Sequence, residues 1–189
     1  MITYPEMLKQ RRSVRDFQDK KVDLEIVKEI IAEAALAPSA SNGQPWRFVV
    51  INNRQIMKKI SDENKKNLLE DFSRNPAALN PSYKAILSDE KFNIFYNAPC
   101  VIYVVGSRDV RSLDCDCALA VSYLMFAAVA RGLGTCWIGL GAYVRDPETK
   151  AQMGIADDCR IVAPVIIGYP QTIPALPPRR ALQILKIIN

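Results

Sequence analysis

The 189-residue chain contains no histidine. Without histidine it cannot build a Ser-His-Asp or Cys-His nucleophilic centre, and almost every common transition-metal site is excluded except one made of cysteines alone. The sequence therefore predicts no metal site, and no residue is forced into the role of catalytic acid, base or nucleophile. Any chemistry is expected to belong to a bound cofactor.

The chain also shows no secretion signal and no apolar run of membrane length. Residues 1–6 have neither a basic region nor an apolar stretch, and the apolar segment 117–130 is shorter than the roughly 20 residues that cross a bilayer. The five cysteines are odd in number and mostly lie in apolar runs, which is typical of buried reduced thiols. Cys115 and Cys117 remain a possible metal or redox pair. We expect a cytoplasmic protein that does not contact a membrane.

The charge pattern gives little support to nucleic-acid binding. The net charge is +5 and the pI is near 9.0, but the basic pairs, of which Lys20-Lys21 and Lys58-Lys59 are examples, are scattered and are not interleaved with aromatic residues. A solvated surface is the better interpretation. With 49% hydrophobic and 24% charged residues, the chain is predicted to form a single globular domain over 1–189.

The segment 116–131 is predicted to be the central helix. Asp114 and Asp116 suit a helix N-terminus, and Gly132 can supply the left-handed exit. No charge interrupts its interior, and a helix that is apolar all round must be buried on every side. Because a domain of this size has little room to surround one helix, we expect one face to pack against a second copy of the chain. An ordinary central helix of a monomer stays open as the alternative.

Other elements are predicted by local signals. Asp23 is a helix cap that precedes a helical pattern of apolar residues, and Asp146 starts a short helix that Gly154 ends. The apolar runs 99–106 and 160–170 predict two central strands of a sheet that helices cover on both faces. A third strand is predicted at 47–51, and Pro164 implies a bulge or an unpaired position in the last strand.

Two segments are expected to lie outside this core. The stretch 56–97 is polar and irregular apart from a helical piece at 57–69, and it ends in aromatic residues. Within it, 63–97 is predicted to be a lid or excursion over a site, with a plain surface insertion equally open. The tail 174–189 ends in an apolar sequence, which does not stay in water, so we expect it to dock, with the other subunit as one candidate surface.

An arginine cluster follows the predicted first helix. It consists of Arg11, Arg12, Ser13 and Arg15. The guanidinium groups would repel one another unless an anion or acidic groups compensated, and their forks match phosphate oxygens in pairs. Two interpretations stay open, namely anion binding and surface arginines paired with Asp16 and Asp19.

The loop 38–46 is rich in small and amide residues and precedes the strand at 47–51. Asn42 and Gln44 each offer a donor and an acceptor, which reading the edge of a flavin-like ring requires. Such residues also often satisfy their own turn.

Four stretches together resemble the FMN-dependent nitroreductase family in order and spacing. They are residues 11–17, 38–46 and 132–139 and the pair Arg179-Arg180. The residues that would contact FMN by this resemblance are Arg11, Arg12, Ser13, Arg15, Pro38, Ser39, Ala40, Asn42, Gln44, Trp137, Ile138, Gly139, Arg179 and Arg180. Those of the 38–46 loop would reach the flavin from the partner subunit, and either arginine of the pair would serve the phosphate.

The resemblance also implies a fold and an activity. The fold is α+β, with a mixed sheet flanked by helices and a homodimer across the long apolar helix, the flavin lying at the interface. The activity is an FMN-dependent oxidoreductase that takes a hydride from NADH or NADPH and reduces nitroaromatic, quinone or related small acceptors. Because no separate acceptor site is evident in the sequence, we expect donor and acceptor to use one cavity in turn, which is a ping-pong mechanism. The alternative is a flavin-binding store or redox sensor without turnover.

Overall fold

A computed structural model describes residues 2–76 and 80–188. Its elements in chain order are α1 (Tyr4–Gln10), α2 (Leu24–Ala34), η1 (Ala40–Asn42), β1 (Arg47–Ile51), α3 (Arg54–Arg74), α4 (Ser82–Ser88), β2 (Cys100–Ser107), α5 (Leu113–Ala130), β3 (Gly134–Trp137), η2 (Gly139–Ala142), α6 (Pro147–Gln152) and β4 (Cys159–Gly168). The two η elements are short 3-10 helices.

The strands form one four-stranded sheet in the order β1-β2-β4-β3, and each neighbouring pair is antiparallel. β2 and β4 are the central strands, as their continuous apolar sequences predict. The predicted α+β class is confirmed. Among the described residues, the parallel part of the expected mixed sheet is limited to one bridge between Ser13 and Thr135.

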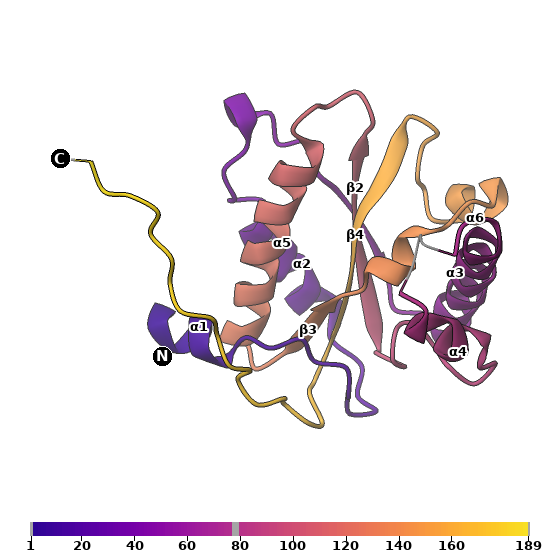
Figure 1. Ribbon diagram of the computed structural model, residues 1–189, viewed down its shortest axis with the longest axis horizontal. Coiled ribbons are helices and arrows are strands. Elements are labelled where there is room, and N and C mark those ends of the chain that lie inside the picture. Colours follow the sequence, from indigo (N-terminus) through magenta and orange to yellow (C-terminus); the bar gives the residue numbers. More distant parts are fainter. Residues whose placement is uncertain (1, 77–79, 189) are drawn as a thin grey trace.

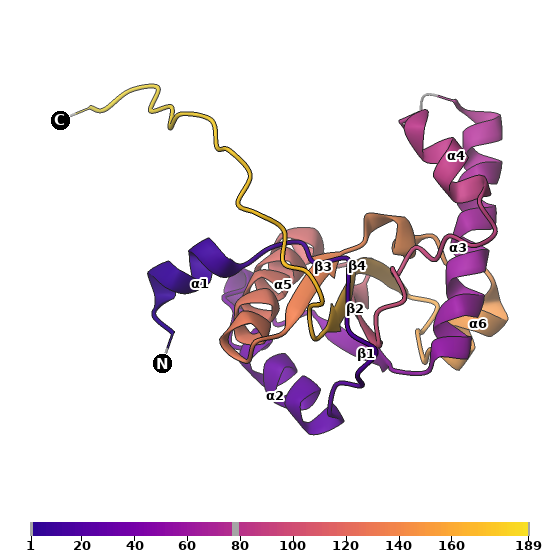
Figure 2. The same ribbon diagram turned by 90° about the horizontal axis from the view of Figure 1, so that it is seen from below.

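Helices cover both faces of the sheet (Figure 1, Figure 2). Successive side chains of a strand point to opposite faces, so β2 contributes to two cores. Ile102 and Val104 pack with buried residues of α2 and α5, whereas Val101 and Tyr103 pack with buried residues of α3. The expected sheet between helical layers is confirmed.

The predicted helix boundaries are confirmed at their caps. The Asp23 carboxylate accepts a hydrogen bond from the backbone nitrogen of Glu25 at 2.9 Å, and Asp146 caps α6 in the same way. Gly132 and Gly154 adopt φ angles of 71° and 69° after α5 and α6. This left-handed conformation is favourable for glycine and ends a helix.

The predicted irregularity in β4 is present but lies before the proline. The register with β2 shifts between Val104 and Val105, so Val162 has no residue opposite it. Pro164 itself faces Tyr103 within the ladder. The extra residue therefore forms a β-bulge two positions before Pro164.

α5 is the predicted apolar helix, but a single chain does not bury it on every side. Cys117, Val121 and Leu124 are buried against the sheet and α2, whereas Leu119 and Tyr123 are 42% and 43% exposed. The helix is long and apolar enough to cross a membrane by length and composition, yet half of its residues are buried within this chain. It is the core helix of the fold, with one apolar stripe left uncovered.

The predicted helical piece at 57–69 is confirmed but was too short, and the expectation that the rest of 56–97 is irregular is wrong at 70–74 and at 82–88. α3 runs unbroken for 21 residues, and α4 follows it. The polar residues on its buried face are Ser61, Asn64, Lys65 and Asn67. Hydrophobic periodicity under-predicts such a helix, because polar groups occupy positions that are normally apolar. Residues 77–79 of the expected lid at 63–97 lie outside the described residues.

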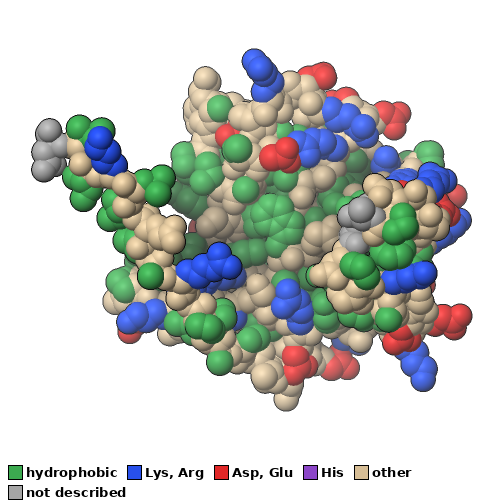
Figure 3. Space-filling view, in the orientation of Figure 1, with side chains coloured by type: hydrophobic (Ala, Val, Ile, Leu, Met, Phe, Trp, Pro, Cys, Tyr) green, Lys and Arg blue, Asp and Glu red, His purple; other side chains and the backbone are tan. Residues whose placement is uncertain are grey.

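The tail leaves the body beside α1 and extends away from it (Figure 1, Figure 3). Every described residue from Gln171 onward is exposed, including Leu182 at 87% and Leu185 at 98%. Within one chain the described part of the tail is therefore not docked, and its docking stays a prediction. Residue 189 lies outside the described residues.

Candidate cofactor site

The segment that carries the arginine cluster lies along the free edge of β3. The backbone nitrogen of Val14 donates to the carbonyl of Thr135 at 3.0 Å, and Ser13 forms the parallel bridge with the same residue. In this extended geometry, side chains alternate between two sides. Arg12 and Val14 are buried on one side, while the residues between and beside them, Arg11, Ser13 and Arg15, face the other side and stay more accessible.

Arg12 is separated from the rest of the cluster by this alternation. Its guanidinium group donates to the carbonyl oxygens of Lys9 and Arg11 at the C-terminal end of α1. The last carbonyls of a helix lack intrahelical partners, and a cation is favourable there. The side chain of Arg12 therefore caps α1 within this chain.

Arg11 and Arg15 keep uncompensated charges. Neither forms an ion pair with a carboxylate in the described part of the chain. Asp19 pairs with Arg54 instead, and Asp16 contributes its backbone carbonyl to the nitrogen of Gln171 at 3.0 Å. The alternative of surface arginines neutralised by neighbouring aspartates is therefore wrong, and an anion from outside the chain fits these two side chains.

Cys136 shows where the accessible members of the cluster meet. Burial raises the pKa of its thiol, and Arg15, a hydrogen bond with Ser13, and Arg11 oppose this shift. Ser13 pairs with Thr135, the neighbour of Cys136, so the accessible members of the cluster lie along this part of the β3 edge. The thiol stays neutral at physiological pH and offers no nucleophile.

Tyr96 also lies against Arg15. The guanidinium carbon of Arg15 is 5.7 Å from the centre of the Tyr96 ring, which is cation–π distance. Tyr96 and Asn97 both adopt left-handed φ angles, 52° and 54°. Such conformations are unfavourable outside glycine and persist where the surroundings enforce them, often at functional sites. Burial raises the pKa of Tyr96, so its hydroxyl group is neutral at physiological pH.

The backbone after β3 is open to a ligand. Trp137 is 37% exposed, and the backbone nitrogen of Ile138 donates to the carbonyl of Pro164 at 2.8 Å, which fixes the course of the chain. A Cβ atom at Gly139 would meet nothing within 4 Å. A flat ring can therefore approach this backbone closely.

The 38–46 loop is fixed at the other end of the molecule. The backbone nitrogen of Ala40 donates to a carboxylate oxygen of Asp116 at 3.0 Å, at the start of α5. The arginine segment lies near the end of α5, because Arg12 and Val14 line one hollow with Gly132. Since Asp116 and Gly132 are 16 residues apart along α5 and its exit, the two sites are separated by about 24 Å of helix. One chain does not bring them together.

Within the loop, the amides satisfy their own turn. The backbone nitrogen of Gln44 donates to the Ser39 hydroxyl at 3.0 Å, and its side-chain amide donates to the Asn42 carbonyl at 3.3 Å. Pro38 and Ala40 are exposed beside them. Left-handed φ angles at Ser41, Asn42 and Gln44 hold the loop in a strained, specific shape.

Arg179 and Arg180 are not brought to the cluster within one chain. Both are exposed in the extended tail, and neither has a hydrogen bond or ion pair within residues 2–76 and 80–188. Their predicted role needs a tail that docks.

Sequence reasoning missed two features of this arrangement. Asp116 is buried and anchors the 38–46 loop, although it was interpreted only as a helix-starting residue. The polar buried face of α3 was also missed. Asn53, which caps α3, and the absence of glycine and proline from 54 to 74 were the available signals.

Comparison with known proteins agrees with this arrangement. The nitroreductase family model matches residues 8–169, so the chain belongs to the nitroreductase family. An Archaeoglobus fulgidus protein named as a candidate NADH dehydrogenase/NAD(P)H nitroreductase is 31% identical, over 88% of this chain and 84% of that protein. The 5,6-dimethylbenzimidazole synthase of Rhodospirillum rubrum is 28% identical, over 85% and 79% of the two chains. A Bacteroides fragilis nitroreductase with bound FMN has the same fold, with a TM-score of 0.79 and 23% identity over 100% of this chain and 98% of that chain.

Proposed function

We propose that this protein is an FMN-dependent oxidoreductase that uses NADH or NADPH to reduce small electron-poor acceptors such as nitroaromatic compounds or quinones. The main support is the pair of unneutralised guanidinium groups, Arg11 and Arg15, on the segment that pairs with β3, the strand that leads to the open backbone at Gly139. A phosphate group would compensate the two charges, and a flat ring would lie on the backbone. The family membership agrees with this chemistry.

The residues present fit FMN. Arg11, Ser13 and Arg15 would hold the phosphate, ribityl chain and pyrimidine edge, and the backbone of Trp137 to Gly139 would lie along the ring. When bound, FMN would supply the hydride and electron transfer, while the chain binds the flavin and orients it. Arg12 would contribute indirectly by fixing α1. Arg179 or Arg180 would reach the phosphate only from a docked tail.

The site is completed by a second copy of the chain in this proposal. α5 leaves Leu119 and Tyr123 exposed, and next to this stripe a cavity of about 510 Å³ is lined by Tyr4, Leu36 and Phe126 among others. If two α5 helices pack antiparallel across a twofold axis, the loop at the start of one helix approaches the arginine segment at the end of the other. Pro38, Ser39, Ala40, Asn42 and Gln44 would then contact the partner's flavin.

The choice of acceptor is assigned to a separate segment of the chain. The relatives named above include a nitroreductase and a benzimidazole synthase, so one fold serves different reactions. The segment 63–97 ends in Tyr96 beside Arg15, and we assign it the role of selecting acceptors. Four of the five cysteines are buried free thiols and Cys115 is an exposed one, which suits a reducing cytoplasm.

Steady-state turnover tests the proposal. The FMN-loaded protein is mixed with NADH or NADPH and either a nitroaromatic compound or a quinone, and oxidation of the nicotinamide is followed at 340 nm. We expect many turnovers per flavin that depend on the acceptor concentration. One stoichiometric reduction without further turnover would favour a flavin store or redox sensor, and a protein without affinity for FMN would contradict the assignment.

A further inference from the structure

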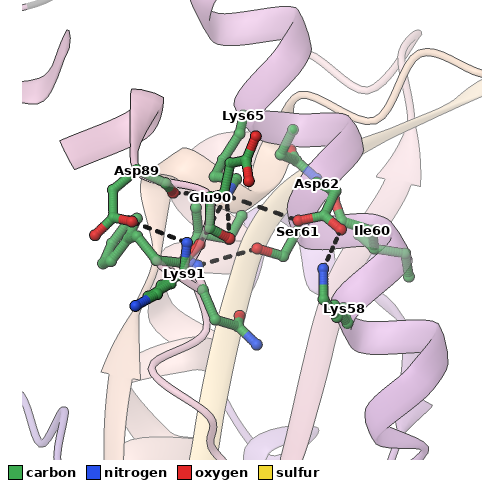
Figure 4. A network of polar contacts seen from close by, with 12 residues as sticks. Lys58, Ile60, Ser61, Asp62, Lys65, Asp89, Glu90 and Lys91 are labelled. Atoms are coloured by element: carbon green, nitrogen blue, oxygen red, sulfur yellow. Dashed lines mark hydrogen bonds and ion pairs between the residues drawn. The ribbon is translucent and has the colours of Figure 1, made fainter. Parts of the chain in front are cut away.

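Lys65 is a lysine of α3 that is only 7% exposed. Its ammonium group donates to the backbone carbonyl oxygens of Asp89 at 3.0 Å, Glu90 at 3.4 Å and Phe92 at 2.9 Å (Figure 4). An ion pair with Asp62 at 3.7 Å is longer than these bonds. A buried ammonium group is unfavourable unless hydrogen-bonded, so the three carbonyls and the lysine hold one another in place.

Ser61 adds a second attachment one helical turn earlier. Its hydroxyl oxygen accepts a hydrogen bond from the backbone nitrogen of Ile94 at 3.1 Å, and both residues are fully buried. Residues four apart on a helix lie on the same face. Ser61 and Lys65 together therefore fasten both ends of the 89–94 segment to α3 (Figure 4).

The fastened segment leads directly to the candidate cofactor site. The Phe92 ring, whose own carbonyl binds Lys65, packs edge-on against the Tyr96 ring at 5.6 Å between ring centres. Tyr96 in turn lies against Arg15, and its left-handed backbone needs support from its surroundings. A continuous set of contacts thus joins the Lys65 ammonium group to Arg15.

The same helix also holds the chain that follows the open backbone at Gly139. Asn64 accepts a hydrogen bond from the backbone nitrogen of Tyr143 at 2.6 Å, and Asn67 donates to the carbonyl of Tyr143 at 2.7 Å. Tyr143 follows η2, which begins at Gly139. The polar face of α3 therefore fixes the main chain both at 89–94 and at Tyr143, which explains why it is buried and polar.

We propose that Lys65 is a positioning residue that fixes the 89–97 segment and thereby places Phe92 and Tyr96 where they select acceptors. This proposal rests on the proposed function, because acceptor selection presupposes turnover. Lys65 itself touches neither flavin nor acceptor. Its effect on acceptor selection passes through the 89–97 segment that it fixes.

The first experiment measures the local stability of the 89–97 segment and does not depend on activity. Lys65→Met removes the ammonium group at similar length, Lys65→Arg keeps a cation, and Lys66→Met is the matched control, because Lys66 is the exposed neighbour. In amide hydrogen exchange, we expect residues 89–97 to exchange at least about tenfold faster in Lys65→Met, with α5 unchanged. Lys65→Arg should recover part of the protection, and Lys66→Met should resemble the wild type. Unchanged exchange in Lys65→Met would overturn the proposal.

The second experiment measures acceptor selection. For Lys65→Met, we expect the ratio of kcat/KM for a bulky naphthoquinone to that for a small benzoquinone to change about tenfold, mostly through KM, with FMN affinity within about twofold. In a Tyr96→Ala background, Lys65→Met should add little, because its effect passes through Tyr96. Faster exchange with an unchanged ratio, or full additivity with Tyr96→Ala, would overturn the positioning role.

The two experiments separate this proposal from the proposed function. A wild type that binds no FMN and oxidises no nicotinamide refutes the proposed function and with it the acceptor role. An active wild type whose selectivity ignores Lys65 refutes only the positioning role. If Lys65→Met does not fold, Lys65→Arg is compared directly with the wild type, and exchange and acceptor selectivity should change in the same direction but by less, because its longer and planar head group can reproduce only part of the three carbonyl contacts.

Discussion

Replacing Arg15 with glutamine should weaken FMN binding without unfolding the protein. The guanidinium group of Arg15 has no carboxylate partner in the described residues, so its removal leaves no buried acid unpaired. What the folded protein loses is the contact with the Tyr96 ring at 5.7 Å, worth about 0.5–1 kcal/mol at an exposed site. Arg11 likewise has no carboxylate partner in the described residues, whereas the guanidinium group of Arg12 donates to carbonyl oxygens at the end of α1.

The expected loss of affinity follows from the bonds that a phosphate would receive. A hydrogen bond to a charged group contributes about 1.5–3 kcal/mol, which corresponds to roughly a 10- to 100-fold change in Kd. Arg11→Gln and Arg15→Gln should each produce a loss in this range. Arg12→Gln should lower the free energy of unfolding by about 1–3 kcal/mol, through loss of the α1 cap, and weaken FMN binding less.

The assay is titration of the apoprotein with FMN, followed by quenching of flavin fluorescence at one fixed salt concentration. Riboflavin, which lacks the phosphate, is titrated in parallel, and at least one of the two variants should lose preference for FMN over riboflavin. Arg111→Gln makes the same charge change at an exposed residue and is the control. If Arg11→Gln and Arg15→Gln both bind FMN within twofold of the wild type, the anion assignment is wrong.

Three further predictions concern assembly, thiols and kinetics. Leu119→Asp should convert a dimer to monomers in sedimentation, whereas Ile86→Asp, at an equally exposed residue of α4, should not; a wild type that is already monomeric with full flavin would refute the interface. Burial raises the pKa of Cys100 to about 12 and of Cys117 to about 11, so only Cys115 should react quickly with a thiol reagent at pH 8. The unfolded thiols ionise near pH 9, whereas the buried thiols of the folded state keep their protons to higher pH. The free energy of unfolding should therefore be unaffected by these thiols below pH 9 and should fall as the pH rises towards 11–12, which melting curves would show as a falling Tm. In the proposed mechanism donor and acceptor would use one cavity in turn, so double-reciprocal plots should be parallel, and intersecting plots would indicate a ternary complex.

Local signals in the sequence were enough to predict most of the fold. Asp23 and Asp146 cap helices by bonds to nearby backbone nitrogens, and Gly132 and Gly154 end helices by their own conformational freedom. These effects act over a few residues, so a sequence contains them in full. The unbroken length of α3 was missed, because its buried face is stabilised by hydrogen bonds to distant backbone segments. No local pattern encodes those partners.

The site was predictable only as a set of residues. Three arginines in five positions indicate an anion, but the side to which each points depends on pairing with β3, which turns Arg12 away from Arg11 and Arg15. The same limit applies to α5. Its uniform apolarity did not distinguish Met125, which is buried at 9% exposure, from Leu119 at 42%. A charge at Met125 would therefore test the core of one chain, and a charge at Leu119 tests the dimer.

The visible spectrum of the purified protein tests the central claim most directly. We expect the absorption bands of bound oxidised FMN, at about 370 and 450 nm. Anaerobic addition of NADH or NADPH should bleach the longer-wavelength band, and a quinone should restore it. A colourless protein that also fails to take up FMN, or a bound flavin that neither nicotinamide reduces, would contradict the account.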